Sequence, residues 1–234
     1  MLLLLVSTIG FSQHDTEKMK KEHVVIGTII KKGKTVDGYI KIKSDVSWNE
    51  RTFPAAWTYQ SDIHFIAKDD FDKLEKVKRK HFEKYQPKDI DGYTYEDLVY
   101  ETVKYSDMSA VGMGMVPKKM FMRKVSEGSI TLFHYFSSPP AIVSGPEGFA
   151  PYYEASSTPQ IVYRKGEDGK LKLVNNLNIK KELAECTVVQ DKHGKGIYND
   201  TEIEKSGLSK LVNNTLLREE TRLLAIKDFN EHCK

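Results

Sequence analysis

The sequence has no long hydrophobic run. Its most apolar stretch, Leu2 to Val6, is far shorter than the about 20 apolar residues that a transmembrane helix needs, which excludes a membrane-spanning helix. No cysteine follows this run, so a lipoprotein anchor has no support either. The chain also lacks a large excess of charge of one sign, because it contains 36 basic and 33 acidic residues. Net charge alone therefore indicates neither nucleic acid nor an anionic membrane as a partner.

Conventional catalytic motifs are absent as well. The sequence lacks the G-x-S-x-G elbow, the S-x-x-K motif, the phosphate-binding G-x-x-x-x-G-K loop and the H-E-x-x-H zinc motif. Its seven histidines are scattered singly, and no two of them lie at the spacing of ligands to one metal ion. We therefore expect no cofactor and no metal, and we consider an enzyme the less favoured class.

The N-terminal segment 1–12 has the features of a secretory signal peptide. Apolar residues lead to Gly10 and Ser12, at a spacing that a signal peptidase accepts before Gln13. The run is short and no basic residue precedes it, as if the recorded start codon lay a few residues too late. A buried N-terminal strand is the alternative. Export predicts a protein of the periplasm or the outer cell surface, with residues 13–23 as an exposed linker.

Alternating apolar residues separated by turn residues predict a series of β-hairpins. The expected strands are residues 24–31, 36–42, 62–67, 93–105, 120–125, 130–136 and two short strands within 160–174. The first hairpin turns at Lys32 to Lys34, and the last at Asp168 and Gly169. Residues 70–85 are ambiguous, because a short helix capped by Asp69 or Asp70 competes with a strand that leads to Tyr85.

The pattern changes to helical spacing near residue 177. Asn178 can cap a helix that places Ile179, Leu183 and Cys186 on one face, and an amphipathic helix with at most one break follows from Leu208. Strands followed by helices indicate an α+β fold. We expect antiparallel hairpins in a sheet or partly open barrel, with the C-terminal helices on or beside it. Residues 24–176 would form a strand-rich domain and 177–234 its helical part.

The two cysteines, Cys186 and Cys233, predict one disulfide bond if the protein is exported to an oxidising compartment. Closing this loop is worth about 4 kcal/mol in chain entropy and would fasten the last helix to the preceding one. The alternative is a metal or thiolate site formed by His232 and Cys233. Adjacent residues on a helix point about 100° apart, which disfavours that alternative.

Two other sets of residues are candidate sites. Phe149, Tyr152 and Tyr153 lie in a loop rich in Pro and Gly, where exposed aromatic side chains often bind partners, although they could equally pack back onto the core. Asp89 and Asp91, beside a tyrosine, are the weak catalytic candidates for a carboxylate-dependent hydrolase. A turn explains the same Asp-Ile-Asp-Gly sequence more simply, because Asp and Gly favour turns for local backbone reasons.

The most basic spot in the chain is formed by Lys76, Lys78, Arg79 and Lys80. Seven acidic residues surround it between positions 69 and 91. The sequence therefore favours a solvated face over a nucleic-acid site.

The order of several segments resembles an uncharacterised family of secreted proteins that is common in Bacteroidetes. The segments are "DGYIKIK", "YQPKDIDGY", "EGSITLFHYF", "IVYRKGEDGKLKLVNN" and the closing "FNEHC", within residues 24–233. In such proteins an aromatic-Asn pair precedes a terminal cysteine and an earlier cysteine follows a short helix, which Phe229, Asn230, Cys233 and Cys186 match. The resemblance implies secretion and the disulfide but supplies no reaction or ligand.

The function that we expect is binding. The leading hypothesis is a non-enzymatic interaction module of the cell envelope that binds an unknown protein or small ligand, without nucleic acid and without a transmembrane segment once the signal is removed. The alternatives are the carboxylate-dependent hydrolase and an envelope assembly factor.

Overall fold

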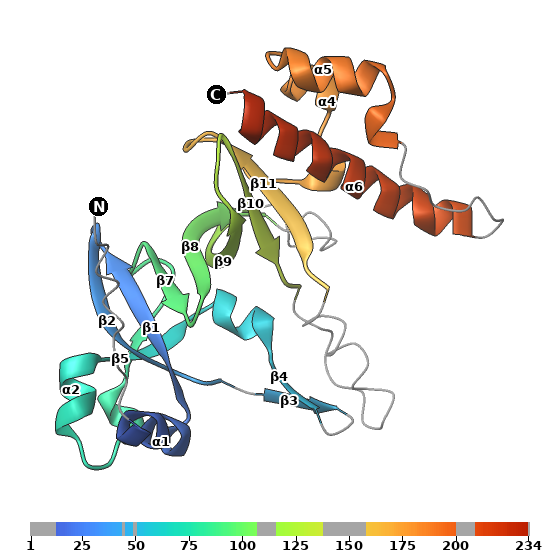
Figure 1. Cartoon of the computed structure of the whole chain (residues 1–234). Coiled ribbons are helices and arrows are strands. Elements are labelled where there is room, and N and C mark those ends of the chain that lie inside the picture. The colour runs from blue at the N-terminus through green and yellow to red at the C-terminus, as the bar shows by residue number, and fades with distance from the viewer. Residues whose placement is uncertain are drawn as a thin grey trace, which may run out of the picture.

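The computed structural model describes residues 13–43, 45–48, 51–106, 116–137, 158–199 and 209–233. Its main element is a large antiparallel sheet (Figure 1). The strands of this sheet are β1 (Val24–Lys31), β2 (Lys34–Lys41), β5 (Ile63–Ala67), β6 (Glu83–Tyr85), β7 (Gly92–Tyr95), β8 (Leu98–Tyr105), β9 (Lys118–Ser126), β10 (Ile130–Tyr135), β11 (Gln160–Lys165) and β12 (Lys172–Leu173). Their order is β12-β11-β10-β9-β8-β7-β1-β2-β5-β6, and β3 (Asp45–Trp48) pairs separately with β4 (Arg51–Pro54).

The sheet is open rather than closed into a barrel, since β12 and β6 lie at its two edges without a strand between them. The chain therefore has the α+β fold that the sequence predicts. The first hairpin, β1 and β2, has Lys31 opposite Lys34 across a two-residue turn. Lys32 and Gly33 in this turn have φ of 53° and 72°, as a tight hairpin turn requires at both central residues.

Two turns differ from the prediction. The expected strand 93–105 is two strands, β7 and β8, which reverse direction at Glu96, where φ is 52°. In the β11–β12 connection the positive φ belongs to Gly166, not to Asp168 or Gly169. Gly169 is required for a different reason, because a Cβ there would lie 2.0 Å from the carbonyl oxygen of Lys165.

The ambiguous segment 70–85 contains both of the predicted conformations. Helix α2 (Lys68–Lys73) is followed by a turn of 3-10 helix, η2 (Arg79–His81), and then by strand β6. The prediction that Asp69 or Asp70 caps the helix is wrong, because the N-cap position belongs to Ala67. Both aspartates lie in the first turn of α2, where the positive end of the helix dipole stabilises their negative charge.

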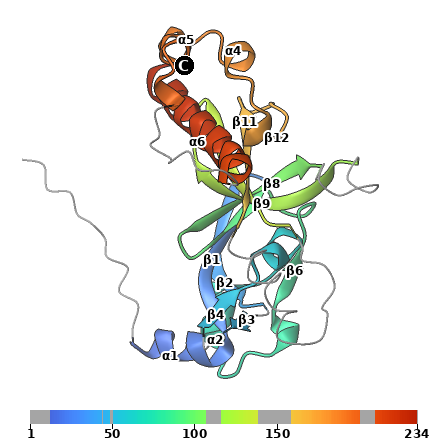
Figure 2. The same ribbon diagram turned by 90° about the vertical axis from the view of Figure 1, so that its right-hand side faces the viewer.

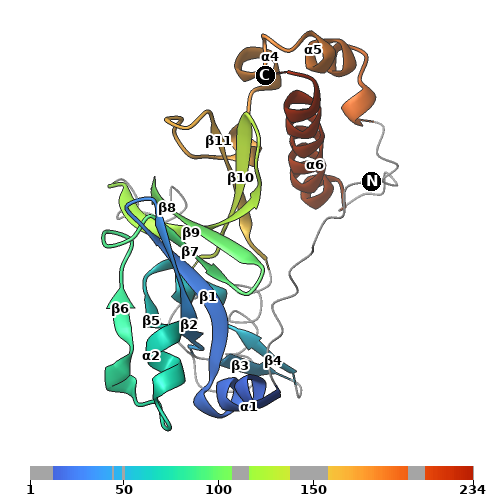
Figure 3. The ribbon, with the colours of Figure 1, turned by 60° about the vertical axis from the view of Figure 1, so that its left-hand side comes forward.

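The expected linker at 13–23 is instead occupied by helix α1 (Gln13–Glu22). Met19 of this helix packs against a cluster that also holds Val24, Phe71 and Phe82. Lys18 Nζ donates a hydrogen bond to the carbonyl oxygen of Phe71 at 2.7 Å, so α1 and α2 are joined. Figures 1 and 3 show the two helices together at one end of the molecule.

The other end is helical and is formed by α4 (Ile179–Glu182), α5 (Thr187–Gly194) and α6 (Ser209–His232), which lie next to β10 and β11 (Figure 3). Asn178 caps α4 as predicted, since its side chain accepts a hydrogen bond from Lys181 N–H. Helix α6 runs without a break for 24 residues. None of the helices in the described ranges combines the length and apolar character needed to cross a membrane.

A buried cluster joins these helices to the sheet. It contains residues from β10, β11 and all three helices: Ile130, Tyr163, Val174, Leu177, Ile179, Leu183, Cys186, Val189, Tyr198, Ala225, Ile226 and Phe229. The Cys186–Cys233 disulfide lies at its margin, with the two Cα atoms 5.6 Å apart. The disulfide prediction is therefore confirmed, and the helical part shares one core with β10 and β11.

His134 in β10 should make the stability of this sheet depend on pH. Its Nδ1 atom is buried and, in the part of the chain that the structure describes, has no hydrogen-bond partner. Burial, helped by the charge of Arg123, lowers the pKa of His134 from 6.5 to about 4. Between these values the unfolded chain binds a proton that the folded chain does not, so the free energy of unfolding should fall as pH is lowered through this window.

The measurement is denaturant unfolding at a series of pH values between 4 and 7, expressed as the difference from His134→Leu. The variant should lose part of the pH dependence. Exposed His23 has φ of 51°, which Asn tolerates, so His23→Asn is the matched control and should keep the wild-type slope. Equal slopes for His134→Leu and the wild type would show that His134 titrates normally.

Candidate functional site

A cleft of about 590 Å³ lies between β8, β11 and the β11–β12 turn. The lining residues are Thr102, Val103, Lys104, Tyr105, Ser106, Pro117, Arg164, Glu167, Asp168, Gly169, Lys170 and Leu171. Buried Val103 and Tyr105 alternate along β8, and half-buried Leu171 packs against the same cluster. The lysines, Lys104 and Lys170, are exposed at its margin. The cleft thus combines an apolar floor with a charged rim, the usual composition of a small-ligand site.

Arg164 is a polar group of this cleft that two contacts hold in place. Its guanidinium carbon lies 5.1 Å from the centre of the Phe133 ring, and Nη1 donates a hydrogen bond of 2.6 Å to Glu101 Oε1. Only 17% of the Arg164 side chain is exposed. Because β8 and β11 both belong to the sheet, Glu101 and Arg164 meet although they are 63 residues apart in sequence.

The guanidinium of Arg164 has hydrogen-bonding capacity left over. It carries five N–H donors, and Glu101 is its hydrogen-bond partner among the described residues. In the part of the chain that the structure describes, its Nε atom also has no partner, but this atom is buried, so a ligand in the cleft would meet the N–H groups of the terminal nitrogens. A guanidinium donates in a planar fork that matches a carboxylate or a phosphate, and a ring beneath it holds the plane in place. The arrangement can therefore receive an oxyanion over the apolar floor of the cleft.

A second hollow of about 460 Å³ adjoins the cleft and shares Thr102, Val103 and Lys104 with it. Asp91 and Glu101 line this hollow together with Lys119. Glu101 therefore takes part in both spaces, since it lines one and bonds to Arg164 in the other.

The two catalytic candidates of the sequence do not converge. Asp89 Oδ2 accepts the N–H of Gln86 at 2.9 Å, and Asp91 Oδ2 accepts the N–H of Gly33 at 3.1 Å. Both aspartates are exposed. Asp89 thus stabilises its own local turn, as the turn interpretation predicts, whereas Asp91 bonds to the distant β1–β2 turn and lines the second hollow. The geometry gives the hydrolase hypothesis little support.

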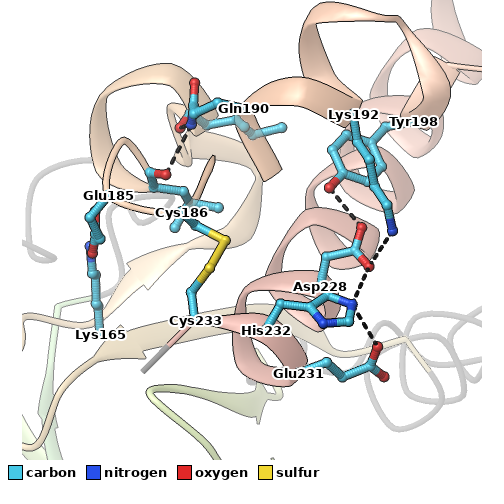
Figure 4. The surroundings of a disulfide bond; sticks show 12 residues. Lys165, Glu185, Cys186, Gln190, Lys192, Tyr198, Asp228, Glu231, His232 and Cys233 are labelled. Carbon is cyan, nitrogen blue, oxygen red and sulfur yellow. Dashed lines mark hydrogen bonds and ion pairs between the residues drawn. A yellow bond between two sulfur atoms is a disulfide. The ribbon is translucent and has the colours of Figure 1, made fainter. Parts of the chain in front are cut away.

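The surroundings of the disulfide hold a second polar cluster, shown in Figure 4. Asp228 accepts hydrogen bonds from Lys192 Nζ at 2.8 Å and from the Tyr198 hydroxyl at 2.7 Å, one at each carboxylate oxygen. Burial alone would raise the pKa of Asp228, but these two hydrogen bonds hold it below 3.8. The polar cluster therefore ties α6 to α5 and to the turn at Tyr198.

Glu231 and His232 lie beside Asp228, and one ligand atom of each comes within 4.8 Å of the others. Two carboxylates and an imidazole are donors that divalent transition metals accept. However, both oxygens of Asp228 already receive hydrogen bonds from Lys192 and Tyr198. We therefore describe these residues as part of the contact between α5 and α6 and assign no metal to them.

The other sequence candidates have mixed outcomes. Cys233 forms the disulfide, which removes it from any site with His232. Phe149, Tyr152 and Tyr153 lie outside the described residues. Neither Arg164 nor Glu101 was among the site residues predicted from the sequence. The signal for Arg164 was a basic pair, Arg164 and Lys165, at the end of the apolar stretch "IVYRK", and charges of this kind occur in many strands.

None of three comparisons with known proteins, against family models, curated proteins and solved structures, finds a match to this chain.

Proposed function

We propose that this protein is an exported, non-enzymatic binding module of the cell envelope, and that it binds a small ligand in the Arg164 cleft. The ligand class is an oxyanion, such as a carboxylate, attached to an apolar body. The observation that carries the proposal is the guanidinium of Arg164 in a cleft with an apolar floor, where Glu101 is its one hydrogen-bond partner among the described residues. The disulfide bond supports export, because such bonds persist in oxidising compartments.

The charges and the apolar surface in the cleft have separate roles in this proposal. An oxyanion would accept hydrogen bonds from Arg164, while the attraction of Lys104 and Lys170 at the margin would be offset by Glu167 and Asp168, which line the same cleft. The apolar body of the ligand would contact Val103, Tyr105 and Leu171. Glu101 would keep the guanidinium oriented but would also compete with the ligand for it.

The experiment uses two carboxylates, benzoate and hexanoate, and the uncharged probes benzyl alcohol and hexanol. Ligand-observed NMR on the purified protein measures binding. We expect both carboxylates to bind at least about tenfold more tightly than the alcohols, because a hydrogen bond to a charged group contributes about 1.5–3 kcal/mol. Arg164→Met, which keeps much of the apolar stem, should remove this preference.

Arg123→Met is the matched control. Arg123 follows Met122 along β9, and Met122 belongs to the same buried cluster as Phe133, so strand alternation directs Arg123 to the opposite face. This control should bind the carboxylates as the wild type does. Equal affinity for carboxylates and alcohols in the wild type, or unchanged carboxylate binding in Arg164→Met with normal thermal unfolding, would contradict the proposal.

A further inference from the structure

The basic run Lys76, Lys78, Arg79 and Lys80 lies between α2 and β6, at one edge of the sheet. All four side chains are exposed. The apolar residues that alternate with them point inward: Val77 and Phe82 are 7% and 9% exposed and belong to the cluster beneath α1 and α2. The burial of these two residues therefore directs the four cations outward on one surface, which we call the basic edge.

The acidic residues near this surface are largely paired elsewhere. Asp72 pairs with Lys68 at 2.9 Å and Asp70 pairs with Lys73 at 3.4 Å, both within α2. Glu83 accepts a hydrogen bond from the Tyr85 hydroxyl at 2.7 Å. Within the described residues, no ion pair joins any cation of the basic edge to a carboxylate. These pairings leave the four cations of the basic edge without an ion-pair partner among the described residues, while exposed Glu75 beside Lys76 and exposed Glu83 keep their negative charge nearby.

Further positive charge lies next to the basic edge. Lys84 forms an ion pair with Asp62, which also pairs with Lys43. One negative charge is therefore shared by two positive charges. Burial lowers the pKa of nearby His64, and the charges of Lys43, Lys84 and Arg79 lower it further although Asp62 opposes them. Arg79 is therefore close enough to this group to extend the positive field of the basic edge toward β5.

We propose that the basic edge docks on the surface of an anionic lipid membrane. Three of its four cations are lysines, whose ammonium groups act as point charges and suit a surface of many mobile anionic headgroups. The aromatic residues of this stretch, Phe71 and Phe82, are buried, so no exposed ring is available there to stack on a nucleic-acid base. The inference is independent of the Arg164 cleft, which lies on other strands.

The test is co-sedimentation of the purified protein with vesicles. The probes are vesicles of 30% phosphatidylglycerol in phosphatidylcholine and vesicles of phosphatidylcholine alone. We expect binding to the anionic vesicles only, with a marked decrease as salt is raised from 0.05 to 0.5 M. Lys78→Gln/Lys80→Gln should lower the partition coefficient by about 25-fold, since each lysine close to an anionic surface contributes about fivefold.

Lys180→Gln/Lys181→Gln is the matched control. It removes the same charge from exposed positions in α4, at the end of the molecule opposite α1 and α2 (Figures 2 and 3). This variant should keep most of the binding. Equal losses in the two double variants would show that only net charge matters and would overturn the docking surface. Binding to neutral vesicles as tight as to anionic ones, or tighter binding to a DNA duplex at the same salt, would overturn the lipid as partner.

Discussion

Replacing both cysteines, in Cys186→Ala/Cys233→Ala, should lower the free energy of unfolding by about 4 kcal/mol. The bond closes a loop between residues 47 positions apart, and without it the unfolded chain gains the freedom that this closure removes. Alanine is the appropriate replacement, because Cys186 is fully buried and a serine hydroxyl there would add the cost of an unpaired polar group.

The effect should be concentrated in the helical end. Cys233 is one of the last described residues of the chain, and its N–H still donates to the carbonyl oxygen of Phe229 at 2.8 Å. Without the bond, the final turn of α6 is held by Phe229 and Ile226 in the shared cluster and by the Asp228 contacts. We therefore expect amide hydrogen exchange to rise first in α5 and in the end of α6, before the strands of the sheet.

Guanidinium unfolding of the oxidised wild type, the wild type treated with reductant, and the double alanine variant provides the measurement. The reduced protein and the variant should agree within about 1 kcal/mol, because both lack the same constraint. Lys227→Ala, at an exposed position of α6, is the control and should change stability little. A loss of less than 1 kcal/mol in both cases would mean that packing alone fastens the helix.

The sequence could predict the hairpins because their signals are local. Lys32 and Gly33 define a turn, and alternating apolar residues on either side define the two strands of β1 and β2. The same holds for the cap at Asn178 and for the pairing of two cysteines when there is no third. The errors are local as well. Helix α1 was missed because its ten residues are nearly all polar, and the few contacts that stabilise it come from residues such as Phe71, far along the chain.

The candidate site could not be predicted, because it depends on the order of strands across the sheet. The pairing of β11 with β10, of β10 with β9 and of β9 with β8 brings Arg164 to Glu101 and the β11–β12 turn to β8. No spacing in the sequence records this order. The basic edge could not be predicted for a similar reason. Asp70 pairs with Lys73 and Asp72 pairs with Lys68 because the helical spacing of α2 places these side chains next to each other.

Asn230 should be an important side chain of α6 for stability, because it joins this helix to the sheet. Its Oδ1 accepts the N–H of Ile130 and its Nδ2 donates to the carbonyl oxygen of the same residue, both at 2.8 Å. The amide therefore pairs with Ile130 as a neighbouring strand would, at the point where β10 begins. Ile130 is fully buried, so its peptide groups have little access to water as an alternative partner.

Asn230→Ala should lower the free energy of unfolding by about 3 kcal/mol, since an unsatisfied buried donor or acceptor costs about 1–3 kcal/mol. Glu231→Ala, one residue further along α6 and exposed, is the matched control and should have an effect within about 0.5 kcal/mol. Asn230→Asp distinguishes the contributions of the two hydrogen bonds to stability. It keeps an acceptor for the N–H but places a carboxylate against the carbonyl oxygen of Ile130, and its loss of stability should shrink as the pH falls and the carboxyl group becomes protonated.

Gly128 provides an independent test of the same contact. A Cβ at this position would lie 2.6 Å, 2.7 Å and 2.8 Å from three atoms of the Asn230 amide, so Gly128→Ala must displace the side chain that pairs with Ile130. The two changes therefore act on one contact and should not be additive. The double variant Gly128→Ala/Asn230→Ala should lose about as much stability as Asn230→Ala alone, because the atoms that clash are gone. Additive losses in this double-mutant cycle would show that Gly128 is required by the turn itself and not by Asn230.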